Sequence, residues 1–520
     1  MVTFLVKVRL ILTAVLVLLF IFLQSSKINL ATADLGRHLK NGEIILQGDP
    51  WQIWRTNSYS YTHSDYPFLN HHWGSGIIFF LIWRIAGFVG LSIFFSLITL
   101  VTFWLFFRLA WKGSRFSVAW LTAILVLPVL VSRTEIRPEI FSYLFAGVFW
   151  WILDNFRQKR LSSRFLFLLP LLMLFWVNLH IYFFLGFFLI GVFFLEELVF
   201  VLKKTGGLRD LSYLRNLSIA GGLCLVASFL NPAGLKGLWY PLQIFKGYGY
   251  RLFENQTVWF LDKLVNYPPS LYFKIVFGVL VLSWVYAFLA KRKVTHRCFL
   301  FSLFFSFMGW TAVRNLTLFG YFAWPIIAGN LREIGRGEKT GERPELEDFM
   351  AASLGGLLLL GLFLLNSSYW LARLSLGFGL EKGNEKAAEF FLENHLSGPI
   401  FDNYDNGGYL IYYLFPKERV FVDNRPEAYP KEFFEKTYIP MQESEEKWQE
   451  VEKEYHFNAI FFYRLDLTPW GQNFLVSRIK DSAWAPVYVD NWSIIFLKRS
   501  SQNQTSIQKY ELPKEIFSVR

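Results

Sequence analysis

One acidic residue, Asp34, has a position suited to catalysis. It lies in the segment ATADLGRHLKNGEIIL, shortly after the first long hydrophobic run. A carboxylate held near a membrane surface can accept the proton of a hydroxyl group while that hydroxyl attacks an activated sugar. Asp is also among the best N-cap residues, and a helix is predicted to start at Leu35. The sequence leaves both roles open, and the two are compatible. Arg37 and His38 follow on the same segment and are candidates for binding a substrate.

Two arginines, Arg133 and Arg137, lie in the turn SRTEIRPEI between two hydrophobic runs. The planar guanidinium group suits a phosphate or pyrophosphate, so at least one of them is a candidate ligand of a lipid-linked phosphate. Glu135 and Glu139 support the alternative, which is a local network of ion pairs at a helix end.

Two further turns place polar residues in equivalent positions. Asn178 and His180 occur in WVNLHIYFF, and Arg314 and Asn315 occur in VRNLTLF. Each residue alone is more typical of a helix cap or an interface anchor. Together they predict polar groups around one external cavity, to which Arg133 and Arg137 would also contribute.

Adjacent histidines, His71 and His72 in LNHHWG, suggest a metal site at first sight. The side chains of neighbouring residues diverge, however, and no further ligand follows at a diagnostic spacing. No metal is therefore predicted, and the two histidines are kept as candidates for substrate binding. The sequence does not identify a cofactor. A lipid-linked sugar would be a substrate rather than a cofactor.

The densest polar segment of the tail is FDNYDNGGYLIYYLF. It places Asp402, Asn403, Asp405, Gly407 and Gly408 between a predicted strand and a predicted helix. A helix N-terminus after a glycine-containing turn can receive an anion. The nearby acidic residues disfavour phosphate, so we expect a structural turn or a loop that contacts a glycan.

The composition identifies a membrane protein. Of 520 residues, 54% are hydrophobic and only 18% are charged, which is too apolar for a water-soluble globule of this size. The net charge of +12 does not indicate nucleic acid, because the basic residues are scattered through short loops between apolar runs. The 57 Phe and 20 Trp residues suit spans with aromatic belts.

Hydrophobic runs of roughly 20 residues predict about eleven transmembrane helices. Their centres fall near Val15, Phe95, Leu125, Leu144, Leu172, Phe188, Leu225, Val279, Phe305, Ala323 and Leu359. The first run lacks a following cleavage site of small residues and is predicted to be an uncleaved span.

Alternate loops are basic, which by the positive-inside rule places them in the cytoplasm. Their basic residues are Arg108, Lys112 and Arg115; Arg157, Lys159, Arg160 and Arg164; Lys203, Lys204, Arg209 and Arg215; Lys291, Arg292, Lys293 and Arg297; Arg332, Arg336, Lys339 and Arg343. We therefore expect the amino terminus inside, the carboxyl terminus outside, and a multi-pass location in the plasma (inner) membrane.

Two domains are predicted. A transmembrane domain covers residues 1–375 and includes a first external loop at 24–73, followed by an amphipathic run, GSGIIFFLIWRIAG, expected to lie at the interface. A small extracytoplasmic α/β domain covers 380–520. In it we expect a helix at 384–395 and strands at 399–401, 419–422, 459–463, 485–489 and 493–497.

The order of these parts resembles multi-pass glycosyltransferases of the GT-C superfamily. It is similar in plan to protein O-mannosyltransferases and lipid A aminoarabinose transferases. The resemblance rests on Asp34 in a long first external loop, on the external turns with IRPE and VNLH, and on the external α/β tail. Many members carry a second acidic residue beside or soon after the first, whereas Leu35 follows Asp34 here.

The resemblance implies an inverting transferase that takes a sugar from a polyprenyl-phosphate-linked donor at the outer face of the membrane and passes it to a glycan, lipid or protein. Asp34 would be the general base, and Arg133, Arg137 or Arg314 would contact the donor phosphate. Two alternatives remain open: a transporter or flippase for a lipid-linked saccharide, and a non-catalytic member that binds a glycan. The predicted span centres carry almost no charge, which disfavours coupled transport.

Overall fold

The chain divides into two compact units, and each is described by itself. The computed structural model describes residues 2–48, 50–203, 208–243, 247–291, 295–332, 344–372 and 377–517. Unit 1 comprises Met1–Ser26, Ser92–Gly234 and Leu252–Phe378, and unit 2 comprises Lys27–Leu91, Leu235–Arg251 and Gly379–Arg520. Of the predicted cytoplasmic loops, Lys204, Arg292, Lys293, Arg336, Lys339 and Arg343 lie outside the described residues.

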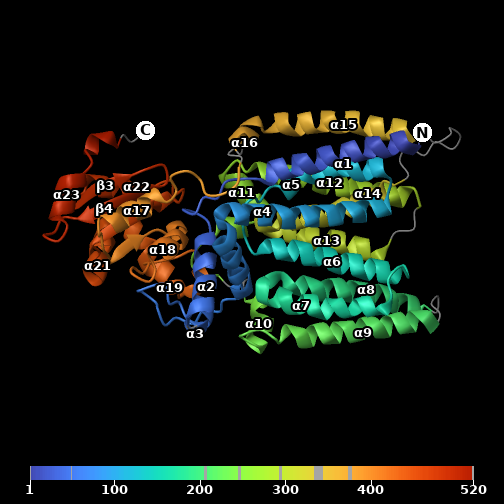
Figure 1. Ribbon diagram of the computed structural model, residues 1–520, viewed down its shortest axis with the longest axis horizontal. Coiled ribbons are helices and arrows are strands. Elements are labelled where there is room, and N and C mark those ends of the chain that lie inside the picture. The colour runs from blue at the N-terminus through green and yellow to red at the C-terminus, as the bar shows by residue number, and fades with distance from the viewer. Residues whose placement is uncertain are drawn as a thin grey trace. The chain divides into compact units, whose positions relative to one another are not determined.

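Unit 1 is a bundle of helices (Figure 1). Its helices are α1 (Val2–Gln24), the later part of α4 (Trp73–Gly113), α5 (Phe116–Leu130), α6 (Glu139–Arg157), α7 (Leu168–Leu179), α8 (Phe184–Leu202), α9 (Leu208–Ser228), α11 (Val258–Leu264), α12 (Pro268–Leu289), α13 (His296–Thr311), α14 (Leu316–Asn330), α15 (Pro344–Leu365) and α16 (Ser367–Ala372). Short 3₁₀ turns join several of them: η1 (Ser163–Phe167), η2 (Ile181–Phe183), η4 (Phe253–Asn255) and η5 (Val313–Asn315).

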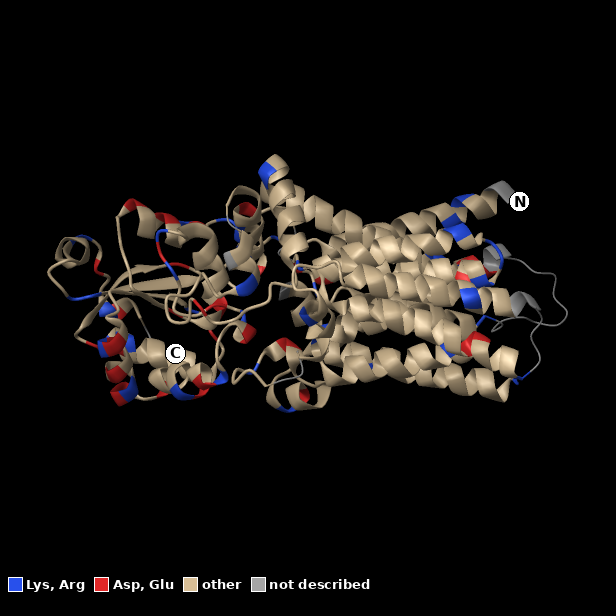
Figure 2. Ribbon diagram, turned by 90° about the horizontal axis from the view of Figure 1, so that it is seen from below, with Lys and Arg blue, Asp and Glu red and all other residues tan. Residues whose placement is uncertain are grey.

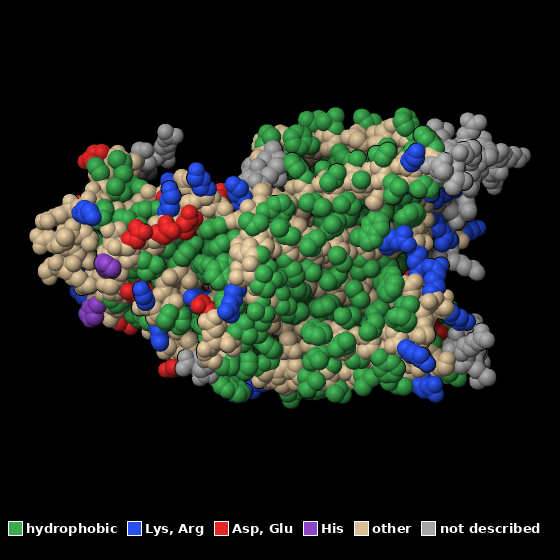
Figure 3. Space-filling model, viewed as in Figure 1, with side chains coloured by type: hydrophobic (Ala, Val, Ile, Leu, Met, Phe, Trp, Pro, Cys, Tyr) green, Lys and Arg blue, Asp and Glu red, His purple; other side chains and the backbone are tan. Residues whose placement is uncertain are grey.

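Every predicted span centre lies in one of these helices. Five described helices are long and apolar enough to cross a bilayer: Phe4–Gln24, Trp73–Gly113, Ile181–Leu202, Pro268–Leu289 and Glu347–Leu365. Phe116–Leu130 and Ser163–Leu179 are shorter apolar helices. Hydrophobic side chains cover the face of the bundle that Figure 3 shows, and the chain is a helical membrane protein.

Charged residues of unit 1 gather near the helix ends and are nearly absent from the middle of the bundle (Figure 2). Many Lys and Arg residues lie at the end of the bundle where the chain begins. We call this end the basic end. It includes Lys112 and Arg157, in the last turns of α4 and α6, and Arg297, which pairs with Asp154 beside Lys112. The last turn of α6 reaches it, whereas the first turn of α6, at Glu139, lies at the opposite end.

Helix α4 changes direction at Gly87, whose φ of 62° and ψ of −161° are not helical. A positive φ of this kind is open to glycine at little cost. The break lies within the run GSGIIFFLIWRIAG, so the segment before it is a helix of its own, as the sequence predicts. The boundary between the two units follows shortly afterwards, at Leu91.

Unit 2 combines the segment that follows α1 with the tail. Its helices are the early part of α4, α2 (Leu35–Gln47), α3 (Pro50–Arg55), α10 (Leu235–Trp239), α17 (Lys386–Glu393), α18 (Gly407–Leu414), α19 (Lys431–Phe433), α20 (Pro440–Glu443), α21 (Glu445–Tyr455), α22 (Pro469–Lys480) and α23 (Gln504–Tyr510). Its shorter turns are η3 (Tyr240–Leu242), η6 (Tyr404–Asn406), η7 (Pro426–Ala428), η8 (Phe434–Tyr438) and η9 (Lys514–Ile516). The predicted loop at 24–73 and the predicted tail at 380–520 thus fall mainly in one compact unit.

A four-stranded mixed sheet forms the core of the tail, in the order β1-β2-β4-β3. The strands are β1 (Ile400–Asp402), β2 (Ala459–Tyr463), β3 (Trp484–Val489) and β4 (Ser493–Lys498). β1 runs parallel to β2 with Phe401 opposite Ile460, and β4 is antiparallel to both β2 and β3. Four of the five predicted strands are therefore present.

The predicted strand at 419–422 is wrong. Val420 makes only an isolated bridge, to Ser60 of the first loop. Its N–H donates to the carbonyl of Tyr59 at 3.1 Å, and its own carbonyl accepts from the N–H of Tyr61 at 3.1 Å. Sequence alternation alone does not reveal a partner more than 300 residues away, so the segment has a strand-like pattern without joining the sheet.

Glycines allow the helices of unit 2 to approach closely. A Cβ on Gly36 of α2 would lie 2.6 Å from the carbonyl oxygen of Gly408 in α18. A Cβ on Gly42 of α2 would lie 2.2 Å from the carbonyl oxygen of Gly76 in α4. Both contacts involve backbone, which cannot move aside as a flexible side chain can. The first loop and α18 therefore pack backbone against backbone at the start of α2.

Candidate functional site

Asp34 occupies the N-cap position of α2, but its side chain makes no capping hydrogen bond. Its carboxylate instead pairs with Arg37 one turn later, with 3.6 Å between Oδ1 and Nη2. The Asp34 side chain is 21% exposed, so a ligand can reach it. Asp34 thus lies at the predicted N-cap position, but its side chain does not cap the helix.

Arg37 connects Asp34 to the tail. Its side chain is only 6% exposed, and Nε donates to Oδ1 of Asn424 at 3.1 Å. The amide nitrogen of Asn424 is buried and has no hydrogen-bond partner within the described residues. The buried hydroxyl of Tyr404 also has none in the same part of the chain. Buried donors without partners are costly, so a site that leaves two of them open is suited to a polar ligand.

A buried ion pair fixes the tail segment that carries Asn424. Arg425 donates from Nε to Oδ1 of Asp423 at 2.7 Å and from Nη2 to Oδ2 at 2.6 Å. Nη2 of Arg425 also donates to Oδ1 of Asn57 in the first loop at 2.6 Å. Its guanidinium lies 4.5 Å from the ring centroid of Phe68. A fork of this geometry sets the orientation of both partners, so the Asp423–Glu427 segment is held against the first loop.

Glu427 supplies a second carboxyl group to this region. Burial raises its pKa, although the positive charges of Arg37 and Arg425 act in the opposite direction. Tyr404 has a pKa well above its usual value, because of its burial and of several negative charges that include Glu427 and Asp34. The carboxyl groups of Asp34 and Glu427 thus both act on the hydroxyl of Tyr404.

The candidate histidines of unit 2 lie together. The ring centroids of His38 and His72 are 5.6 Å apart, and those of His71 and His72 are 3.8 Å apart. Nδ1 of His71 lies 3.2 Å from the carbonyl oxygen of Leu69, and its ring packs against Tyr240. Among the described residues, no group of three or more His, Cys, Asp or Glu side chains has an arrangement that could hold a metal ion.

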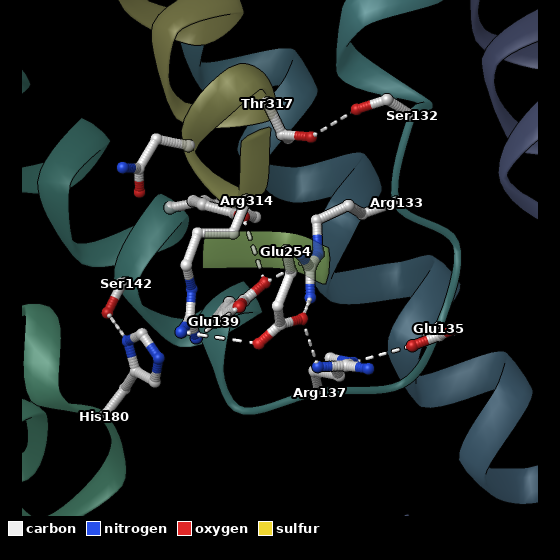
Figure 4. Close-up of polar contacts among 12 residues, drawn as sticks. Ser132, Arg133, Glu135, Arg137, Glu139, Ser142, His180, Glu254, Arg314 and Thr317 are labelled. Atoms are coloured by element: carbon white, nitrogen blue, oxygen red, sulfur yellow. Dashed lines mark hydrogen bonds and ion pairs between the residues drawn. The ribbon is translucent and has the colours of Figure 1, made fainter. Parts of the chain in front are cut away.

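The candidate arginines of unit 1 converge on Glu254 (Figure 4). The cluster includes Glu139 in the first turn of α6, so it lies at the end of the bundle opposite to the basic end. Its Oε2 lies 2.9 Å from Nη2 of Arg133 and 2.8 Å from Nη1 of Arg137. Its Oε1 lies 3.4 Å from Nη1 of Arg314. The three arginines come from two separate turns of the chain and thus form one cluster.

Two more carboxylates complete this arginine cluster. Glu139 accepts from Arg314 at 3.1 Å and lies 3.1 Å from Nε of Arg133, and Glu135 pairs with Arg137 at 2.7 Å. Burial alone would raise the pKa of Glu254, but the guanidinium groups outweigh it and hold that pKa well below its usual value. The three positive charges therefore meet three negative charges, as the alternative of a local ion-pair network predicts.

The remaining candidates of unit 1 divide into two groups. Asn315 accepts from the hydroxyl of Tyr182 at 2.7 Å, and the ring of Tyr182 lies beside His180 and Arg314. His180 is buried, with its Nδ1 2.7 Å from Oγ of Ser142 (Figure 4). The side chain of Asn178 donates to the carbonyls of Leu174 and Leu230 at 2.8 and 2.9 Å.

The polar turn of the tail has a structural role in its described contacts. Oδ1 of the buried Asp402 accepts from the N–H of Phe421 at 2.7 Å, and Asn403 donates to Asp466 at 2.9 Å. Asp402, Asn403 and Asn406 are all buried. These contacts agree with the predicted structural turn.

Asp402 should make stability depend on pH. Burial raises its pKa well above the usual value, so the folded protein holds a proton there that the unfolded chain loses above about pH 4. The contribution of Asp402 is fully present below that pH and declines as the pH rises towards the folded pKa. Asp402→Asn keeps an oxygen for the N–H of Phe421 and needs no proton. The difference in unfolding free energy between variant and parent should therefore shift in favour of the variant by roughly 1 kcal/mol or more as the pH rises from 5 to 7.5. Thermal unfolding at these two pH values tests this, and an equal difference at both would contradict it.

Comparisons with known proteins identify the fold. No protein-family model and no curated protein matches the sequence. The archaeal oligosaccharyltransferase AglB from Archaeoglobus fulgidus, solved with an inhibitory peptide and a dolichol-phosphate, superposes with a TM-score of 0.57 at 11% identity, over 95% of this chain and 74% of that one. ArnT from Cupriavidus metallidurans, bound to undecaprenyl phosphate, gives 0.51 at 12% identity, over 95% of this chain and 98% of that one. The chain has a GT-C fold.

Sequence reasoning missed the residues that the tail contributes near Asp34. Asp423, Asn424, Arg425 and Glu427 follow a segment whose pattern predicts a strand, and the partners of Asn424 and Arg425 in the first loop lie more than 300 residues earlier in the chain. One signal was present: four of five consecutive residues in DNRPE are polar or charged, directly after an apolar FV pair.

Proposed function

We propose that this chain is a membrane glycosyltransferase that transfers a sugar from a polyprenyl-phosphate-linked donor to an acceptor at the outer face of the plasma membrane, with inversion. The observation that carries the proposal is the link from Asp34 through Arg37 to Asn424, beside two buried polar atoms without described partners. The GT-C fold supports it, since the neighbours with this fold are named as transferases or were solved with polyprenyl or dolichol phosphates.

In this proposal Asp34 acts as the general base. Its carboxylate takes the proton from a hydroxyl or amide of the acceptor while the oxygen or nitrogen of that group bonds to the anomeric carbon of the sugar. The bond between the anomeric carbon and the phosphate oxygen breaks on the opposite side. Arg37 holds the carboxylate in place, and Glu427, whose pKa is raised, is the second carboxyl group that the sequence around Leu35 lacks. General base catalysis of this kind typically contributes about 10²- to 10⁴-fold.

Arg133, Arg137 and Arg314 are proposed to contact the donor phosphate. In the arginine cluster each of them already pairs with a carboxylate, so a phosphate would bind by taking over contacts that Glu254 makes. The phosphodiester of the donor carries one negative charge, as a carboxylate does, but it accepts hydrogen bonds on several oxygens and gains negative charge as the bond to the sugar breaks, so its contacts with the arginines become stronger during transfer. His38, His71, His72, Asn178, His180 and Asn315 remain proposed substrate contacts.

The proposed topology follows the sequence: about eleven spans, the amino terminus in the cytoplasm, and the tail outside. This orientation puts the basic end of unit 1 in the cytoplasm and Glu139 at the outer face.

The test is transfer by the purified full chain in liposomes that contain polyprenyl-phosphate-linked sugars. We expect free polyprenyl phosphate to appear together with a glycosylated acceptor, in equal amounts. Movement of the intact lipid-linked saccharide between leaflets, with no cleavage of the sugar–phosphate bond, would instead identify a flippase. Binding of a glycan without either reaction would identify a non-catalytic member.

A further inference from the structure

A cavity lies in unit 1 at the basic end, and therefore away from the arginine cluster. It has a volume of about 310 Å³ and is lined by the ends of α4, α6, α12, α13 and α14. Ligand pockets of proteins begin at about this size. The residues that line it are not among those proposed for sugar transfer.

The cavity has a cationic lining. Lys112, Arg297 and Arg332 contribute to it, whereas Asp154 is the one acidic residue of the lining in the described part of the chain. Asp154 bridges two of the cations, with 2.8 Å to Nζ of Lys112 and 3.2 Å to Nη2 of Arg297. Behind the lining, Arg297 also pairs with Glu196 at 2.6 Å. Arg297 nevertheless keeps a buried Nε without a hydrogen-bond partner among the described residues.

The rest of the lining is apolar. Leu109, Trp150, Ala287 and Ile326 line the cavity next to the cations. A soluble anion would use only the charged part. A phosphate attached to hydrocarbon uses both parts, and basic pockets between membrane helices at the cytoplasmic side are known to take anionic lipid headgroups.

We propose that this cavity binds the phosphate of an anionic membrane phospholipid at the basic end of the bundle. The phosphate meets Lys112, Arg297 and Arg332, and the first carbons of the lipid lie against the apolar lining. The site is separate from the proposed transfer, because its lining shares no residue with the arginine cluster or with the surroundings of Asp34. The proposed orientation decides in which leaflet this lipid site lies, but the site itself does not depend on that orientation.

Two variants separate the cavity from the general charge of this end. Arg332→Gln removes an exposed cation of the lining and leaves the buried ion pairs of Arg297 intact. Gly329→Leu fills the cavity, and the nearest atom to a Cβ there is the carbonyl oxygen of Gly113 at 4.0 Å, so the backbone has room for it. Arg108→Gln is the matched control, because Arg108 is an exposed arginine of α4 that does not line the cavity.

The experiment is native mass spectrometry of the purified full chain with added phosphatidylglycerol or phosphatidylcholine. We expect phosphatidylglycerol to remain bound to the parent. Arg332→Gln should weaken this binding about fivefold, as the loss of one cation near a lipid phosphate does. Gly329→Leu should abolish binding, and Arg108→Gln should bind as the parent does. Equal binding of the two lipids, or an equal loss in Arg108→Gln, would overturn the proposal. Displacement of the lipid by inorganic phosphate at a similar concentration would identify a site for free phosphate and overturn it as well. Since Arg332 is exposed, its variant remains informative if Gly329→Leu fails to fold.

Discussion

Exchanging Asp34 for Asn is expected to lower sugar transfer by about 10²- to 10⁴-fold, the usual contribution of a general base. Asn keeps the shape of the side chain and can still accept a hydrogen bond, but it cannot take the acceptor's proton. The loss should appear in kcat, because the acceptor is still held by other groups. Measurement of initial rates with a polyprenyl-phosphate-linked donor in liposomes provides the number.

The control for this exchange is Asp65→Asn, which changes an exposed aspartate of the same unit. It should transfer sugar at the parental rate. Asp34→Asn should unfold at the parental temperature, because Asp34 is partly exposed and its pairing with Arg37 is long at 3.6 Å. A variant with full activity would remove Asp34 from the mechanism, and a variant that no longer folds would assign it a structural role instead.

Exchanging Glu254 for Gln is expected to lower the free energy of unfolding by about 3–5 kcal/mol, the typical cost of breaking a buried ion pair on one side. Glu254 faces Arg133, Arg137 and Arg314 at once. Without its charge the three guanidinium groups repel one another, and Glu139 and Glu135 are left to balance them. Thermal unfolding of the purified chain measures the loss.

The matched control is Glu135→Gln. Glu135 is 51% exposed and pairs with Arg137, so its loss should cost less than about 1 kcal/mol. The pH dependence has a defined sign: because the pKa of Glu254 is held well below its usual value, its contribution is present above that usual value and is lost as the pH falls through the lowered one. Equal melting temperatures of the two variants would contradict the central role of Glu254.

The same variant also probes donor binding. If Arg133, Arg137 and Arg314 contact a lipid phosphate, added polyprenyl phosphate should restore part of the stability that Glu254→Gln loses, because the phosphate replaces the missing negative charge. A zwitterionic lipid should not. If neither lipid restores stability, the arginine cluster is a structural network and the donor phosphate binds elsewhere.

The helices of unit 1 could be predicted because lipid imposes a simple rule on sequence. A helix that crosses the hydrocarbon is apolar over about 20 residues, so long apolar runs indicate helices, and every predicted centre lies in a helix, although several of these helices are shorter than 20 residues. The strands β1, β2, β3 and β4 were recognisable for a similar reason, since each is a short apolar run between turns.

The surroundings of Asp34 could not be predicted in the same way. Local patterns identify Asp34 and Arg37, but the partners Asn424 and Arg425 come from a segment whose own pattern resembles a strand. The arginine cluster illustrates the same limit: the sequence marks the turns with Arg133 and Arg314, whereas nothing in its local pattern identifies Glu254 as the residue that joins them. Pairings between distant segments are decided by packing, which a single sequence does not state.

The close approach of Gly36 to Gly408 has a consequence for how this protein can change during evolution. The helix that begins at Asp34 and the helix that follows the tail's first strand share one contact surface, so neither can gain a side chain there without a matching change in the other. A tail exchanged between related proteins would therefore have to match the backbone of the Asp34 loop along this seam.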